Sequence, residues 1–185
     1  MRNIKSRQRF RVCFWRELLL LLAHPNCVKR KVKWILAALI VVFALLQFAN
    51  PPHTNPPVVP GHDLMATSPP PLPIAAMLQS ACYDCHSDKT RWPWYSRIAP
   101  VSWLIASDVN EGRQHINLSD WPVEFPERAA KRLERMSEEI DYGNMPPAKY
   151  TLLHANARLT QDQRKTLTDW LDQEAARLKT TVTNK

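Results

Sequence analysis

The sequence has only three glycines, and its first 50 residues contain only one acidic residue. Glycine-rich loops that cradle phosphates need more glycine than this, so nucleotide binding is disfavoured. Residues 1–50 carry ten Lys and Arg against Glu17, whereas the other 135 residues carry 15 basic and 16 acidic side chains. The net charge of +8 therefore describes a basic leader. A near-neutral body lacks the basic surface that binds phosphate backbones, and we expect no nucleic-acid partner.

The body also lacks runs of alternating β-branched residues, which excludes a sheet and favours helices. Apolar residues recur at helical spacing over residues 74–83, 100–111, 124–140 and 160–179. Gly112 stands where a C-cap glycine ends a helix, and Thr160 with Gln163 forms a capping box. The fold class predicted is all-α, with a small helical domain over residues 74–180.

Two segments precede this domain. The apolar run 34–49 follows a basic region, residues 1–33, and contains one polar residue, Gln47. This layout predicts a transmembrane signal anchor, with a cleaved signal as the alternative. Sixteen residues span about 24 Å, less than the ~30 Å hydrocarbon core. Residues 50–73 contain nine prolines and predict an extended linker in which His53 and His62 are solvated. A translation start near Val28 or Val32 is a further hypothesis.

The residues that carry chemistry are Cys82-Tyr-Asp-Cys85-His86, a CxxCH motif. Two thiols at this spacing each add to one vinyl group of a haem, and the adjacent histidine becomes an axial ligand of the iron. A thioredoxin-like dithiol needs a βαβ context, and a zinc site needs a second cluster, but no cysteine follows Cys85. A disulfide between the two cysteines closes a loop too small to stabilise much. The motif predicts covalently attached haem c.

A second axial ligand is expected downstream, and Met145 is the leading candidate. It lies between Gly143 and two prolines in an irregular segment, whereas Met77 and Met136 fall on apolar helix faces. His115 and His154 are the alternatives. The aromatic-rich segment 90–97 is suited to walling a flat cofactor, and its arginines, Arg91 and Arg97, are candidates for pairing with haem propionates.

The joint pattern resembles the small haem-binding domain proteins of bacterial c-type cytochromes. The resemblance covers residues 72–172 and rests on Cys-Tyr-Asp-Cys-His-Ser (82–87), Thr-Arg-Trp-Pro-Trp-Tyr-Ser (90–96), Ile-Ala-Pro-Val-Ser-Trp-Leu (98–104), Asp-Val-Asn-Glu-Gly-Arg (108–113), Gly-Asn-Met-Pro-Pro (143–147) and Leu-Leu-His (152–154). It implies a monohaem cytochrome c-like domain behind an N-terminal membrane segment. It also implies that Cys82, Cys85 and His86 attach and ligate the haem and that Met145 is the distal ligand. Asn144 and Lys149 depart from the pattern.

The resulting expectation is a membrane-anchored monohaem c-type cytochrome that carries electrons, with haem c iron held between His86 and Met145. The haem domain is expected in the periplasm, where it meets redox partner proteins. Two other classes stay open: a haem c peroxidase-like enzyme, and a gas or redox sensor in which a ligand displaces Met145.

Overall fold

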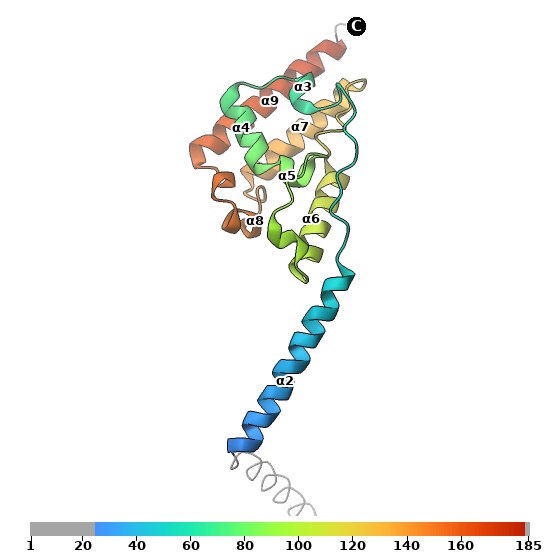
Figure 1. Ribbon diagram of the computed structural model, residues 1–185. Helices are drawn as coiled ribbons and strands as arrows, with labels where there is room; N and C mark the ends of the chain where they lie inside the picture. The colour runs from blue at the N-terminus through green and yellow to red at the C-terminus, as the bar shows by residue number, and fades with distance from the viewer. Residues whose placement is uncertain (1–24, 184–185) are drawn as a thin grey trace, which may run out of the picture. The chain divides into compact units, whose positions relative to one another are not determined.

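The computed structural model describes residues 25–183, and the chain divides into two compact units, Met1–Asn50 and Pro51–Lys185. Every regular element between residues 25 and 183 is a helix, which confirms the all-α prediction (Figure 1). Most of the predicted basic region, residues 1–33, lies outside the described residues.

The first unit is described from Pro25 and consists of α2 (Pro25–Leu46), followed by the 3-10 turn η1 (Gln47–Ala49). Within it Val28–Ala49 is long and apolar enough to cross a membrane, and none of this stretch is buried. Its 22 residues span about 33 Å, but four of its first six residues are Lys or Arg, so its uncharged part is the predicted run 34–49. Such a helix near the N-terminus is the element that a membrane anchor or a signal requires.

The second unit contains short helices before and after the CxxCH motif and two long helices that build its core. In chain order they are α3 (Leu64–Thr67), α4 (Leu72–Ala81), α5 (Tyr83–His86), η2 (Trp94–Arg97), α6 (Val101–His115), α7 (Pro126–Asp141), α8 (Ala148–Leu153), η3 (Ala155–Ala157) and α9 (Gln161–Thr183). The helices predicted over 74–83, 100–111, 124–140 and 160–179 correspond to α4, α6, α7 and α9. Residues 148–153, for which the sequence predicted no helix, form the helix α8.

The long helices α7 and α9 pack against each other because each presents one apolar face. In α7 the buried residues Ala129, Leu133, Met136 and Ile140 follow helical spacing, and Pro126 occupies the first turn, where its missing N–H is harmless. Helix α9 starts at the predicted capping box: Thr160 N donates to Gln163 Oε1 (2.9 Å), and Gln163 N donates to Thr160 Oγ1 (3.2 Å).

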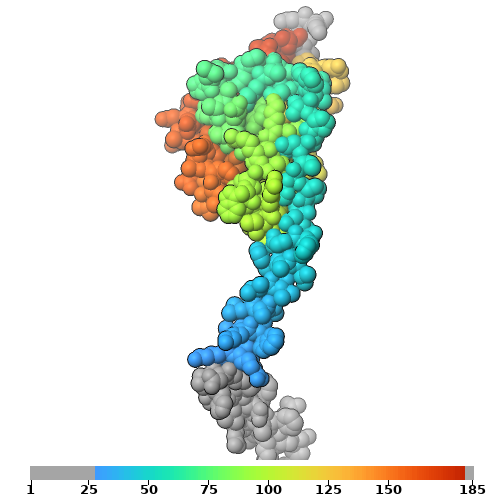
Figure 2. Space-filling view, in the orientation of Figure 1, coloured from blue at the N-terminus to red at the C-terminus, as the bar shows by residue number. Residues whose placement is uncertain are grey.

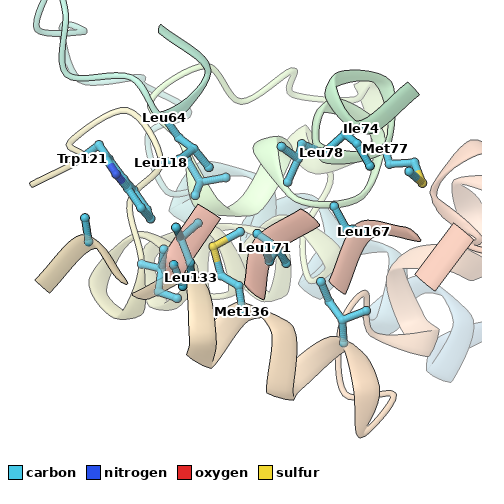
Figure 3. Close-up of a cluster of buried hydrophobic side chains, with 14 of the residues drawn as sticks. Leu64, Ile74, Met77, Leu78, Leu118, Trp121, Leu133, Met136, Leu167 and Leu171 are labelled. Carbon is cyan, nitrogen blue, oxygen red and sulfur yellow. The ribbon is translucent and has the colours of Figure 1, made fainter. Parts of the chain in front are cut away.

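The core joins these two helices to the elements around the motif (Figure 3). Leu133 and Met136 of α7 and Leu167 and Leu171 of α9 lie beneath side chains from α3, α4 and the segment after α6. That upper layer contains Leu64, Ile74, Leu78, Leu118 and Trp121. The cysteine motif is thus connected to the core at both of its ends, by α4 before it and by the segment around Leu118 after it.

Part of the proline-rich segment docks on the domain, although it was predicted to be a solvated spacer. Figure 2 shows the chain from residue 51 onward, in cyan, lying along the surface formed by residues 90–115. Asn55 bonds to Thr90 O (2.9 Å), His53 lies edge-on to Trp92 (4.8 Å), and Leu64 is fully buried. His62 is half-buried, and its carbonyl accepts from Trp121 N (2.7 Å). Residues 53–64, called the docked segment below, therefore belong to the folded domain.

Candidate functional site

The CxxCH motif forms a single helical turn. Cys82 ends α4, and its carbonyl accepts from the backbone N–H groups of Cys85 (3.2 Å) and His86 (2.9 Å). This turn places both cysteines and the histidine on one short element. Both thiols are free and half-buried. The local fold therefore presents two thiols and one imidazole together, as the sequence predicted.

The imidazole of His86 is fixed through its Nδ1 atom. Nδ1 lies 2.9 Å from Gly112 O and 3.1 Å from Ile116 O, at the end of α6. Because carbonyl oxygens only accept hydrogen bonds, Nδ1 carries the proton, and Nε2 keeps its lone pair as the basic nitrogen of the ring. Burial lowers the pKa of His86, which favours the neutral imidazole. Proteins commonly orient a histidine ligand in this way, through a hydrogen bond from the ring nitrogen that does not bind the metal.

Gly112 makes this contact possible by letting α6 approach the motif. A Cβ atom at Gly112 would lie 2.6 Å from the carbonyl oxygen of Cys85, closer than real Cβ contacts come. Glycine is needed at this position because the backbone of α6 approaches the backbone of Cys85 closely. The helix continues beyond it to His115, so the prediction that Gly112 caps the helix is wrong.

The residues after His86 are tied to the same part of α6 and to the docked segment. His86 O accepts from Leu118 N (2.7 Å), and Arg113 Nε donates to Ser87 O (2.9 Å). Arg113 Nη2 also donates to Asn55 Oδ1 (2.8 Å) and Thr90 Oγ1 (2.8 Å). One guanidinium thus joins α6, the loop after the motif and the docked segment.

Burial keeps both thiols protonated in this site. The pKa of Cys82 is raised to about 12, first by burial and then by Cys85. The pKa of Cys85 is raised to about 11 by burial, with the nearby carboxylate of Asp108 as the next cause. Zinc binds thiolates, and residues 25–183 bring together no group of three or more metal-binding side chains. Within residues 25–183 the motif therefore lacks the four ligands that a structural zinc site needs.

Asp84, between the two cysteines, is at the centre of a polar cluster. Arg91 Nε donates to Asp84 Oδ1 (3.1 Å), and Tyr150 Oη donates to Asp84 Oδ2 (2.9 Å). Burial, followed by the charge of Asp84, raises the pKa of Tyr150 well above its usual range, so the phenol stays a donor. Arg91 was a candidate partner of haem propionates, and in the structure it pairs with the motif itself.

Met145 lies in a separate segment between α7 and α8. Its side chain is half-buried and packs against the hydrophobic core. Its backbone is fixed at both ends, since its N–H donates to Glu139 O (3.1 Å) and its O accepts from Arg164 Nη1 (3.3 Å). The turn before it needs Gly143, whose φ is 74°. The pairing of Met145 with His86 across a haem stays a prediction.

The two rival histidines differ in their surroundings. His115 is exposed at the end of α6. His154 stacks on the Tyr150 ring (centroids 4.0 Å apart), with Nδ1 lying 3.0 Å from Tyr150 O and Nε2 lying 3.0 Å from Tyr95 Oη. Both nitrogens of His154 are engaged in these contacts.

Sequence reasoning missed four residues that organise this site, namely Gly112 as a contact residue, Arg113, Tyr95 and Tyr150. The spacing of Gly112 within a helical apolar pattern offered a signal, because glycine inside such a pattern often has a packing reason. Nothing local in the sequence places Tyr150, 66 residues after Asp84, beside the motif.

The fold and the motif define a class of protein: a small all-α domain whose one-turn motif carries two thiols and a histidine held through Nδ1 by backbone carbonyls. Comparison with protein families agrees. The model of the haem-binding domain matches residues 41–173, more than half of the chain, and the chain belongs to this family of haem proteins.

A curated relative is cytochrome c peroxidase Ccp of Escherichia coli (strain K12), which is 24% identical over 111 residues. The match covers 56% of this chain and 23% of that protein, so the chain spans about a quarter of the relative's length. No solved structure matches the chain.

Proposed function

We propose that the chain is a membrane-anchored monohaem c-type cytochrome that carries electrons, with haem c bound to Cys82 and Cys85. His86 is the proximal ligand and Met145 the distal one. The observation that carries the proposal is the geometry of His86. Its Nδ1–H donates to Gly112 O and Ile116 O, so that Nε2 is free beside two unpaired thiols.

Haem, when bound, supplies one-electron chemistry at its iron, and the residues of the chain determine how it is attached and ligated. Each thiol adds across one vinyl group: its sulfur forms a carbon–sulfur bond, and its hydrogen goes to the other vinyl carbon. The backbone carbonyls behind His86 keep Nδ1 protonated and orient the ring. A thioether from Met145 as second ligand favours the reduced iron and gives a higher potential than a second imidazole.

The proposal places the haem domain outside the cytoplasm. Covalent haem c attachment takes place there in bacteria, and the helix Val28–Ala49, in which a basic start is followed by the apolar run 34–49, supplies the element for export or anchoring. The partners are then redox proteins that reach the periplasmic side of the membrane. A reporter fused after Lys185 tests the orientation, since only a reporter that works in the periplasm should be active.

Haem staining of a denaturing gel, together with a reduced spectrum, tests the attachment. The protein is made in a host with the c-type maturation system, as wild type, Cys82→Ala and Cys85→Ala, with Cys27→Ala as the matched control. We expect stain in the wild type and the control and a sharp loss in both motif variants. Full staining of either motif variant would contradict covalent attachment at that cysteine.

A second candidate function, a peroxidase-like enzyme, rests on the similarity to cytochrome c peroxidase. The two functions differ in access to the iron, because a carrier has both axial positions filled. Carbon monoxide added to the reduced protein should leave the spectrum of a carrier unchanged and alter that of a peroxidase or a gas sensor.

A further inference from the structure

We propose that Tyr150 is a positioning residue: its hydroxyl, bonded to Asp84, fixes the Met145-bearing segment against the CxxCH turn and thereby sets the distal ligation of the iron. This inference rests on the proposed function and extends it, because it couples the attachment motif to the distal ligand through one hydrogen bond.

The need for such a residue follows from the poor packing of α8. Helix α8 has six residues, none of them buried, and Leu152 and Leu153 are 72% and 64% exposed. Apolar burial, the usual source of helix stability in a protein, therefore contributes little to placing this helix. Side-chain bonds to neighbouring elements must place it instead.

Two side chains of α8 make such bonds: Lys149 toward α6, and Tyr150 toward the motif and α4. Lys149 Nζ lies 2.6 Å from Asp108 Oδ1, but the Lys149 side chain is 66% exposed. Ion pairs this exposed are screened by solvent and contribute little. Tyr150 is half-buried, and the one hydrogen of its hydroxyl has two acceptors within reach, Asp84 Oδ2 at 2.9 Å and Ser80 O of α4 at 3.2 Å. A half-buried bond to a charged acceptor is the stronger of the two.

Asp84, the acceptor of this bond, is also bonded to Arg91. Arg91 Nε lies 3.1 Å from Asp84 Oδ1 and Arg91 Nη2 lies 3.2 Å from Oδ2, and the side chains of Asp84 and Arg91 are 13% and 73% exposed. The Tyr150 ring also stacks on His154, which in turn meets Tyr95 Oη. Tyr150 therefore joins α8 to the motif at its hydroxyl and to the chain after α8 at its ring.

The backbone of Met145 is held by the two long helices α7 and α9 rather than by the motif. Its backbone bonds lead to α7 through Glu139 and to α9 through Arg164. These bonds set its place on the long helices but do not reach the CxxCH turn. Tyr150, five residues further along, makes that connection, and its loss should let the segment move relative to His86.

The test compares Tyr150→Phe with Tyr142→Phe, a matched control in the same segment whose side chain is 77% exposed. The full-length holoprotein is purified in detergent, and three properties are measured: haem stain, the far-red sulfur-to-iron band of the ferric protein, and carbon monoxide binding. We expect Tyr150→Phe to keep the stain, weaken the band and bind carbon monoxide. Loss of a bond to a charged group corresponds to about a tenfold rise in the open population. Tyr142→Phe should match the wild type.

Asp84→Asn and the double variant refine the result. If the bond between these side chains is responsible, the double variant weakens the band no further than the more affected single variant. Amide hydrogen exchange over residues 145–153 should rise about tenfold in Tyr150→Phe and stay unchanged in α9.

The outcomes separate the two proposals. A wild type with a far-red band and a Tyr150→Phe variant with the same band and the same resistance to carbon monoxide overturn the positioning role alone. A wild type without haem stain, or one with stain but without the band, overturns the proposed function or its Met145 ligand, and the positioning role falls with it.

Discussion

The two sides of the proposed haem site are built by different means. On the attachment side, residues 82–90 and 109–118, backbone groups make the decisive contacts: Gly112 O and Ile116 O fix His86, and Leu118 N bonds His86 O. On the loop side, residues 142–154, side chains link the segment to other elements, chiefly those of Tyr150 and His154. Backbone geometry tolerates little change, whereas side-chain contacts can be removed one at a time. We therefore expect one substitution on the attachment side to disturb that whole side, whereas a substitution on the loop side should remove only the contact of the substituted side chain.

The largest effect is expected from Gly112→Ala on the attachment side. The new Cβ meets the Cys85 carbonyl at 2.6 Å, and neither backbone can yield without moving α6 or α5. Overpacking of this kind costs up to about 3 kcal/mol, and it displaces the carbonyl that orients His86. Denaturant unfolding of the full-length protein in detergent, together with haem stain, measures both consequences. Asn110→Ala on the exposed side of the same helix is the control and should change neither.

Arg113→Lys tests whether the docked segment belongs to the attachment side. A lysine cannot reproduce the fork that reaches Ser87 O, Thr90 Oγ1 and Asn55 Oδ1. We expect a loss of about 2 kcal/mol in the free energy of unfolding and faster proteolysis near Asn55. Arg135→Lys, an exposed change on α7, should have no effect. If Arg113→Lys leaves proteolysis near Asn55 unchanged, the docked segment does not depend on this guanidinium.

Gly143→Ala on the loop side should also destabilise the protein, but for a different reason from Gly112→Ala. A Cβ at Gly143 meets nothing within 4 Å, but the residue has a φ of +74°. An alanine in this left-handed conformation costs about 1 kcal/mol. Gly143→Asn should cost less, since asparagine tolerates the conformation. Unfolding midpoints of the two variants check the order, and an equal loss in both would point to a steric cause instead.

The difference between the two sides also explains what the sequence could predict. The all-α fold, α7 and the start of α9 follow from apolar spacing and from the capping box at Thr160, which are local signals. The CxxCH turn is local too, and so Cys82, Cys85 and His86 were found together. The roles of Gly112 and Tyr150 depend on contacts between distant segments, and those of Arg113 and Asn55 depend on docking of a proline-rich stretch whose composition indicated only an extended chain.

The same reasoning accounts for the wrong end predicted for α6 and for the absence of α8 from the predicted helices. The sequence predicted that α6 ends at Gly112, whereas the helix passes through it. A glycine at a helix interface and a glycine at a helix end look alike in sequence, and only the closeness of Cys85 in the fold distinguishes them. Helix α8 has no buried residue, so it lacks the periodic apolar signal by which helices are recognised.

The smallest effect is expected from Lys149→Gln on the loop side. Lys149 pairs with Asp108 and so joins α8 to α6. By this contact alone, Lys149 would be expected to matter as much as Tyr150 for the placement of α8. Its side chain is 66% exposed and that of Asp108 is 33% exposed, so solvent screens the pair. We expect a change below about 0.5 kcal/mol in the free energy of unfolding, and one that vanishes at high salt. The far-red band and carbon monoxide binding should stay as in the wild type. A loss of the band in Lys149→Gln comparable to that in Tyr150→Phe would show that the loop side moves as a unit, like the attachment side, and would remove the contrast between them.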